Sequence, residues 1–125
     1  MSTLMTVDDV LDLYQLLTAE EPCLAGEPNL PKLEGALGRV ENWLTYGGSE
    51  DVFSIAALYA VSIARSHALP DGNKRTAFLV MTTYLALQGF TLTGDVETLA
   101  QLMVDVASGN VPHEALVARL AVLCE

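Results

Sequence analysis

The sequence predicts an all-α fold, a helical bundle with two buried central helices. Two stretches, residues 52–64 and residues 77–87, contain no charged residue and are apolar on nearly every helical face. A helix that is apolar all round belongs at the centre of a core. The length of 125 residues and the apolar share of 51% suit one domain, residues 1–125, that fills a core without disulfides or a metal.

The first helix is predicted from a cap and an apolar stripe. Thr6 and Asp9 form a capping-box pattern, with Asp in the place of Glu, where the stripe begins. The stripe has the helical i, i+3, i+4 and i+7 spacing and consists of Val7, Val10, Leu11, Tyr14 and Leu17. Residues 22–31 follow with three of the five prolines, and we expect a loop or a short β-hairpin flap there.

Prolines and glycines mark the boundaries of the next three helices. Pro31 suits the first turn of a helix that ends near Tyr46, before a Gly-Gly pair. Residues 49–51 supply a cap and an acidic first turn for the central helix that runs to about Ser66. The second central helix covers about residues 73–87, with a glycine just beyond its end.

Two shorter helices complete the chain. Residues 90–93 alternate in polarity over too few positions to predict a strand. Asp95 caps a helix that runs to about Ala107, and Pro112 opens a last helix that ends near Leu120. The central pair therefore has shorter or amphipathic helices to cover it.

The charge balance excludes several kinds of partner. Sixteen acidic residues stand against six Lys and Arg, which gives a formal net charge of −10. A surface that binds DNA, RNA or anionic lipid needs a basic face. Cys23 and Cys124 lack disulfide or metal-site spacing, and no segment has the features of a signal peptide or a bilayer span. We therefore expect a cytoplasmic protein with reduced thiols that binds neither nucleic acid nor membrane.

Three of the six cations, Arg65, Lys74 and Arg75, lie near the junction of the two central helices. Lys74 and Arg75 fall in the first turn of the second helix, where a cation costs roughly 0.3–1 kcal/mol against the helix dipole. The arrangement makes physical sense if an anion occupies this helix start, because unpaired N–H groups, the dipole and two cations together bind phosphate. Arg65 has a second interpretation, as a residue that braces the loop from the preceding helix.

The loop before this helix start contains groups that suit phosphoryl chemistry. His67 offers an imidazole, a group that can act as a general base. Asp71 offers a carboxylate for Mg²⁺, which proteins bind through one or two carboxylates together with substrate phosphates. Gly72 allows close approach to the backbone, and Asn73 can donate or accept at the rim. A base, a metal-binding carboxylate and phosphate-binding groups together indicate phosphoryl or nucleotidyl transfer.

Each of these residues also has an ordinary structural interpretation. His67 can bond the last carbonyls of its helix, and Asp71 can be a turn residue. Lys74 and Arg75 can be a solvated surface pair. The occurrence of all of them within nine residues, between two core helices, favours a site. His113 stands alone and is expected at the surface or beside a cap, and a zinc site on His67 and Asp71 lacks a third ligand.

Residues 67–75, His-Ala-Leu-Pro-Asp-Gly-Asn-Lys-Arg, resemble the signature of the Fic superfamily, His-x-Phe-x-Asp-x-Asn-x-Arg. Lys74 stands where most Fic proteins have a second glycine, and this substitution marks the Doc (death on curing) branch, the toxins of toxin–antitoxin pairs. The resemblance extends over about residues 7–120 and implies the helical Fic fold. The motif phenylalanine is Leu69 here, and because leucine is also apolar we expect only a modest loosening of the loop.

The resemblance implies a role for each position of the motif. His67 would be the catalytic base, and Asp71 would hold Mg²⁺. The phosphates of ATP would be held by Gly72, Asn73, Lys74 and Arg75. In the Doc branch the lysine crowds the phosphate pocket, so that ATP binds in the reversed sense and its γ-phosphoryl group is transferred.

The implied function is that of a toxin that phosphorylates a Ser or Thr hydroxyl of a translation factor, elongation factor Tu in the family, and so blocks protein synthesis. Two alternatives stay open: transfer of AMP to a protein hydroxyl, and a nucleotide-binding module without catalysis. Residues 20–31 correspond to the flap that aligns the target in Fic proteins. Residues 30–35 lack the hydroxyl residue of the internal inhibitory motif, so restraint is expected from an antitoxin whose amphipathic helix binds an apolar groove near the loop.

Overall fold

The described residues fold into six α-helices, which confirms the predicted all-α class. The computed structural model describes residues 4–20 and 26–125. Its helices are α1 (Val7–Glu20), α2 (Leu30–Thr45), α3 (Val52–Ala64), α4 (Asn73–Leu87), α5 (Val96–Ser108) and α6 (His113–Leu123). Across the described part of the chain, no helix is long and apolar enough to cross a bilayer.

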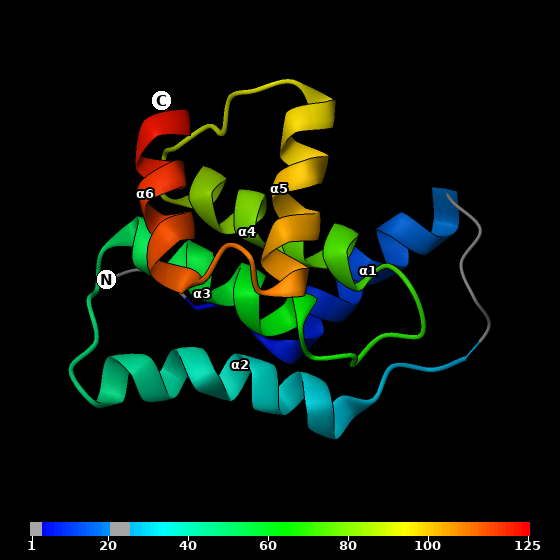
Figure 1. Ribbon diagram of the computed structural model, residues 1–125. Coiled ribbons are helices and arrows are strands. Elements are labelled where there is room, and N and C mark those ends of the chain that lie inside the picture. The colour runs from blue at the N-terminus through cyan, green and yellow to red at the C-terminus, as the bar shows by residue number, and fades with distance from the viewer. Residues whose placement is uncertain (1–3, 21–25) are drawn as a thin grey trace.

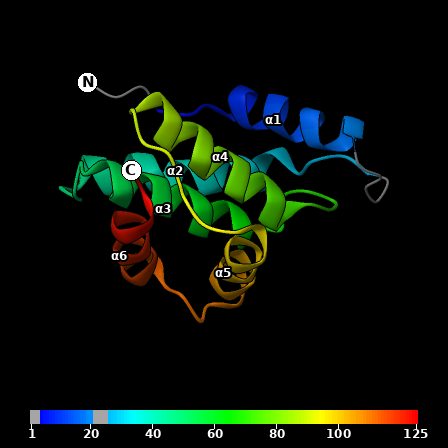
Figure 2. The ribbon, with the colours of Figure 1, turned by 90° about the horizontal axis from the view of Figure 1, so that it is seen from above.

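Helix α3 is the centre of the bundle. It contacts α2, α4, α5 and α6, and eleven of its thirteen residues are buried. In Figure 1, α2 runs along one side of α3, while α5 and α6 lie on the opposite side. Figure 2 shows α1 on the other side of α4 from α5 and α6, and α4 contacts both α1 and α5. The two central helices therefore support the loop between them from within the core.

Helix α4 is buried on one side only, which refines the expectation of two buried central helices. Its buried face consists of Thr76, Ala77, Val80, Met81, Tyr84 and Leu85. Phe78 and Leu79 are half-buried, and Leu87 is 66% exposed. An apolar composition therefore does not by itself decide how much of this helix the bundle covers.

Side-chain caps begin α1, α3 and α5 where the sequence predicts them, but α3 lacks the expected acidic first turn, because Asp51 is the cap itself. Thr6 and Asp9 form a reciprocal capping box: the Thr6 N–H donates to Asp9 Oδ2 at 2.9 Å, and the Asp9 N–H donates to Thr6 Oγ1 at 3.1 Å. Asp51 caps α3 through its carboxylate. Asp95 accepts the Thr98 N–H at 2.7 Å, and this hydrogen bond lowers the pKa of the Asp95 carboxyl. Each cap satisfies N–H groups that the helix itself leaves unbonded.

The expected β-hairpin flap has no strand in residues 26–31, the described part of that segment, and its last two residues already belong to α2. Residues 21–25, which include Cys23, lie outside the described residues. The alternating stretch after α4 contributes one isolated antiparallel bridge, between Leu92 and Cys124. Cys124, one of the two bridge residues, is half-buried, and burial raises the pKa of its thiol.

His113 links three helices rather than standing at the surface. It is the first residue of α6 and is half-buried. Its Nε2 lies 2.8 Å from the carbonyl oxygen of Ser54 in α3. The indole of Trp43 in α2 meets the imidazole edge-on, with ring centroids 5.0 Å apart. The expected place beside a cap is correct, but the ring also ties α6 to α2 and α3.

The buried hydroxyl of Tyr59 predicts a loss of stability at alkaline pH. Burial raises the pKa of Tyr59 from 10.0 to about 12, although the Met5 N–H that donates to the hydroxyl oxygen at 2.8 Å lowers it. Above pH 10 the unfolded chain loses this proton first. The free energy of unfolding therefore falls as pH rises from 10 to 12, by at most about 1.4 kcal/mol per pH unit.

Urea denaturation across this pH range measures that slope. Tyr59→Phe should remove it, because phenylalanine has no proton to lose. Tyr46→Phe is the matched control, since Tyr46 is 85% exposed, and it should keep the wild-type slope. Equal slopes in wild type and Tyr59→Phe would contradict the assignment.

Candidate active site

The predicted site residues line one cavity. It has a volume of about 300 Å³ and opens at the junction of α3 and α4. Its walls include every residue that the motif assigns to the site: His67, Asp71, Gly72, Asn73, Lys74 and Arg75. Ala64, Pro70 and Ala107 complete the lining, and Ala107 adds a wall from α5. The volume is at the lower end of the range for small-ligand pockets.

His67 has a left-handed backbone conformation, with φ 52°. Among the described residues it is the one residue other than glycine with a positive φ. Such a conformation costs of order 1–3 kcal/mol and persists only where the surrounding structure holds it, often at functional sites. The exposed imidazole lies just beyond α3 and faces the cavity.

Hydrogen bonds from three directions hold the middle of the loop. The Ala68 N–H donates to Ser66 Oγ at 3.1 Å, and the Ala68 carbonyl accepts the Asn29 N–H at 2.6 Å. The Leu69 N–H donates to Asn73 Oδ1 at 3.1 Å, and the Leu69 carbonyl accepts from Asn73 Nδ2 at 3.0 Å. All four backbone polar groups of this dipeptide are bonded, so the backbone directly after the strained histidine is fixed.

The side chain of Leu69 anchors the loop in the protein interior. It is 4% exposed, at the position where the Fic signature has phenylalanine. On the outer side of the loop, Gly26 lies against Pro70, because a Cβ at Gly26 would meet Pro70 Cγ at 3.3 Å. The segment before α2 therefore packs against the loop as well.

The start of α4 supplies the groups that suit an anion. Gly72 at its N-cap has φ 75°, and the Thr76 N–H donates to the Gly72 carbonyl at 2.8 Å to make the first helical bond. The N–H groups ahead of Thr76 point out of the helix end. Lys74 and Arg75, both exposed, add their charges to the positive end of the helix dipole.

Asp71 supplies one carboxylate to the cavity. Its Oδ1 accepts the Gly72 N–H at 2.8 Å, and this hydrogen bond holds the carboxylate beside the start of α4. Within residues 4–20 and 26–125, no three His, Cys, Asp or Glu side chains gather in a way that would hold a metal ion. A site made by protein side chains alone, such as zinc on His67 and Asp71, therefore does not fit. Mg²⁺ does fit, because it needs only one or two carboxylates when phosphates and water complete its shell.

Arg65 braces the wall of the cavity. Its Nε donates to the Val106 carbonyl oxygen at 3.0 Å, which ties the end of α3 to the last turn of α5, next to Ala107. A cation is favourable at the carbonyl end of a helix. Arg65 therefore acts as a brace, but toward α5 and not, as the sequence suggests, toward the loop.

The sequence assigns no functional role to several residues that contribute to the site, among them Asn29, Ser66 and Ala107. Asn29 acts through its backbone N–H, and Ala107 reaches the cavity because α5 packs there, so neither contribution has a local sequence signal. Ser66 does have one, since a serine often accepts the N–H of the second residue after it in a turn.

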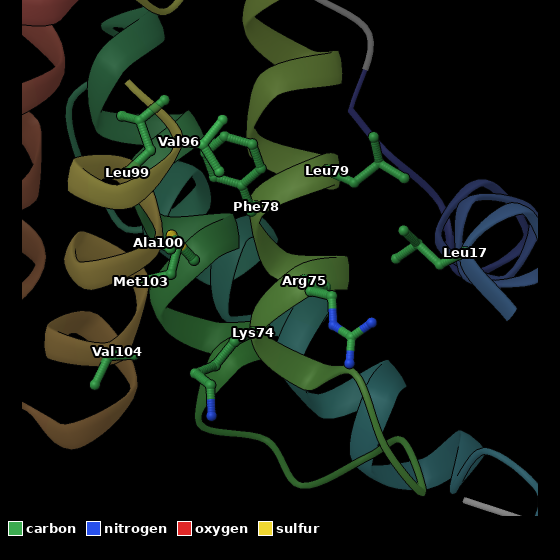
Figure 3. Close-up of a pocket in the computed structure, with 10 residues that line it drawn as sticks. All are labelled: Leu17, Lys74, Arg75, Phe78, Leu79, Val96, Leu99, Ala100, Met103 and Val104. Carbon is green, nitrogen blue, oxygen red and sulfur yellow. The ribbon is translucent and has the colours of Figure 1, made fainter. Parts of the chain in front are cut away.

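A second cavity, of about 490 Å³, shares Lys74 and Arg75 with the first. Its other walls are apolar side chains of α1, α4 and α5: Leu17, Phe78, Leu79, Val96, Leu99, Ala100, Met103 and Val104. Figure 3 shows Leu17 on one side of α4 and the residues of α5 on the other. We call this cavity the α4–α5 groove.

Comparison with known proteins agrees with the motif. A family model described as the Fic/DOC family matches residues 4–85. Protein kinase doc of Escherichia phage P1 is 34% identical over 104 residues, which cover 83% of this chain and 82% of that protein. Toxin Doc of Mycolicibacterium smegmatis is 33% identical over 120 residues, which cover 90% of this chain and 92% of that protein. The chain therefore belongs to the Fic/DOC family.

Proposed function

We propose that this protein is the toxin of a toxin–antitoxin pair and transfers the γ-phosphoryl group of Mg-ATP to a Ser or Thr hydroxyl of a cytoplasmic translation factor. One observation carries the proposal: a single cavity contains a base, a carboxylate and two cations at a helix start. The relatives named Protein kinase doc and Toxin Doc support both the reaction and the role. Elongation factor Tu is the target that the family resemblance suggests.

Phosphoryl transfer needs positioning and charge stabilisation more than covalent chemistry by the protein. His67 accepts the proton of the target hydroxyl. The hydroxyl oxygen forms a bond to the γ-phosphorus, while the bond from that phosphorus to the bridging oxygen breaks and ADP leaves with the electron pair. The N–H groups at the start of α4, together with Lys74 and Arg75, stabilise the negative charge on the phosphates.

Asp71 is the residue that would hold Mg²⁺, together with the phosphates. The ion, when bound, neutralises phosphate charge. The hydrogen bond from the Gly72 N–H to Asp71 Oδ1 keeps the carboxylate next to the helix start. The proposal therefore places the carboxylate and the phosphate-binding groups at one end of α4.

Lys74 favours phosphoryl transfer over adenylyl transfer. Its side chain lines both cavities, at a position where most Fic proteins have glycine. A lysine fills space that a glycine leaves open. We expect this bulk and charge to exclude the nucleotide orientation that AMP transfer needs.

The mass of the product tests the reaction. When purified protein, elongation factor Tu and Mg-ATP are incubated together, intact-mass spectrometry should find one added phosphoryl group on the translation factor. An adenylyl group there would instead support AMP transfer. If no protein of a whole lysate gains either group, the proposed function is wrong.

Two variants locate the reaction in this cavity. His67→Ala removes the base and should lower the transfer rate by about 100-fold or more. Arg75→Ala removes a phosphate contact and should cost a similar factor, partly through weaker nucleotide binding. Arg39→Ala is the matched control, since Arg39 is exposed on α2, and should retain wild-type activity. Full activity in either site variant would contradict the role given to that residue.

The α4–α5 groove supports the expected antitoxin partner. Its walls are apolar, with Lys74 and Arg75 as its cationic members, and Val96 at its edge is 84% exposed. Grooves of this kind bind the apolar face of an amphipathic helix. We infer that a helix of the antitoxin binds here, next to the phosphate site.

A pair of valine substitutions tests this surface. Val96→Glu places a charge in the proposed contact and should weaken binding of the antitoxin by about tenfold or more. Val122→Glu is the matched control, because Val122 is also 84% exposed but lies on α6. Titration calorimetry measures both affinities. An equal effect of the two substitutions, or none, would show that the partner does not use the groove.

A further inference from the structure

The side chain of Asn73 is engaged with the loop that precedes it. Its Oδ1 accepts the Leu69 N–H at 3.1 Å, and its Nδ2 donates to the Leu69 carbonyl at 3.0 Å. We propose that Asn73 is a positioning residue, whose carboxamide holds the loop in the shape that presents His67 and Asp71 to the substrates. Only the backbone of Asn73 then meets the phosphates. This inference rests on the proposed function and departs from the family-based expectation of a phosphate-binding side chain.

The two hydrogen bonds, which we call the Asn73 clamp, join the ends of the segment 69–73. At one end, Leu69 is buried and so fixed in the protein interior. At the other end, Asn73 is the first residue of α4. Asp71 lies between them, so the clamp fixes the carboxylate relative to both the core and the helix start. Loss of the clamp would disturb the carboxylate, while the bond from the Thr76 N–H to the Gly72 carbonyl still holds the start of α4.

The chemistry of the clamp explains why this residue is asparagine. A carboxamide has an acceptor and a donor on one planar group, so it can bond both backbone groups of a single residue. Aspartate would keep the acceptor but would turn a carboxylate oxygen toward the Leu69 carbonyl. Alanine would leave both groups of a part-buried backbone without this partner, which is costly where water cannot fully replace it.

Two further hydrogen bonds in the same loop, both made by Ser66, give an independent comparison. Ser66 Oγ accepts the Ala68 N–H at 3.1 Å and donates to the Ile63 carbonyl at 2.8 Å. If Ser66 and Asn73 both act by holding the loop, loss of either lowers the rate at saturating nucleotide. Loss of both should then cost less free energy than the sum of the two, because contacts within one network are not additive.

The test measures kcat, the Kd for Mg-ATP and the hydrogen-exchange rate of the Leu69 amide. In Asn73→Ala we expect kcat to fall about tenfold, the Kd to change less than about threefold, and the Leu69 amide to exchange about tenfold faster. Asn42→Ala, at an exposed asparagine of α2, is the matched control and should change none of them.

The same kcat and Kd measurements apply to Ser66→Ala, which should lower kcat and leave the Kd unchanged. Its control is Ser108→Ala, because Ser108 Oγ makes the same kind of bond to a carbonyl three residues earlier, at the end of α5. The double variant Ser66→Ala with Asn73→Ala completes the cycle. Strict additivity of the two losses in kcat would contradict a shared role in the loop.

Two results would overturn the proposal outright. A rise of about tenfold in the Kd for Mg-ATP with Asn73→Ala, at any kcat, would identify the carboxamide as a phosphate ligand. An unchanged exchange rate at Leu69 would show that the clamp does not hold the loop in solution. If Asn73→Ala does not fold, Asn73→Ser replaces it, since serine is well tolerated at a helix start but its side chain has no carboxamide.

Failure of the proposed function gives a different result from failure of this inference. A wild-type protein that binds Mg-ATP but modifies no protein contradicts phosphoryl transfer. Two measurements on Asn73→Ala do not require catalytic turnover: the exchange rate of the Leu69 amide and the Kd for Mg-ATP. They therefore still decide whether the carboxamide holds the loop or binds the phosphates.

Discussion

The site depends on how firmly the middle of the α3–α4 loop is attached to the core. Leu69 is buried, and every backbone polar group of Ala68 and Leu69 has a hydrogen-bond partner. These attachments let His67 keep its left-handed backbone and keep Asp71 beside the start of α4. A loop without them would sample many shapes, and the entropy lost on ordering it would weaken substrate binding.

Several features of the site are unfavourable in free energy, and the rest of the bundle compensates for them. A left-handed histidine is strained, and two adjacent cations at a helix start oppose the helix dipole. The burial of α3, which contacts four other helices, offsets such costs. The proposed phosphate would make these two cations favourable. Because the chain has a net charge of −10, Lys74 and Arg75 stand out as a local attraction for anions on an otherwise acidic protein.

Local signals predict most of the scaffold, because caps and breakers act over three or four residues. The capping box of α1 and the Asp95 cap are examples. The spacing of the motif also predicts which residues share the cavity, since a short loop keeps them together. Long-range packing leaves no comparable signal. The Asn29 N–H that holds the Ala68 carbonyl, and the groove beside Phe78, depend on how distant helices meet.

The start of α4 is proposed to bind the phosphates of the substrate. Titration of Mg-ATP into isotope-labelled protein, followed through the backbone amide signals, tests this most directly. We expect the largest shifts at the amides of Asn73, Lys74 and Arg75, with small shifts along α2 and α6. The largest shifts in α5 rather than at the start of α4, or no shift at the start of α4 under saturating nucleotide, would contradict this phosphate site.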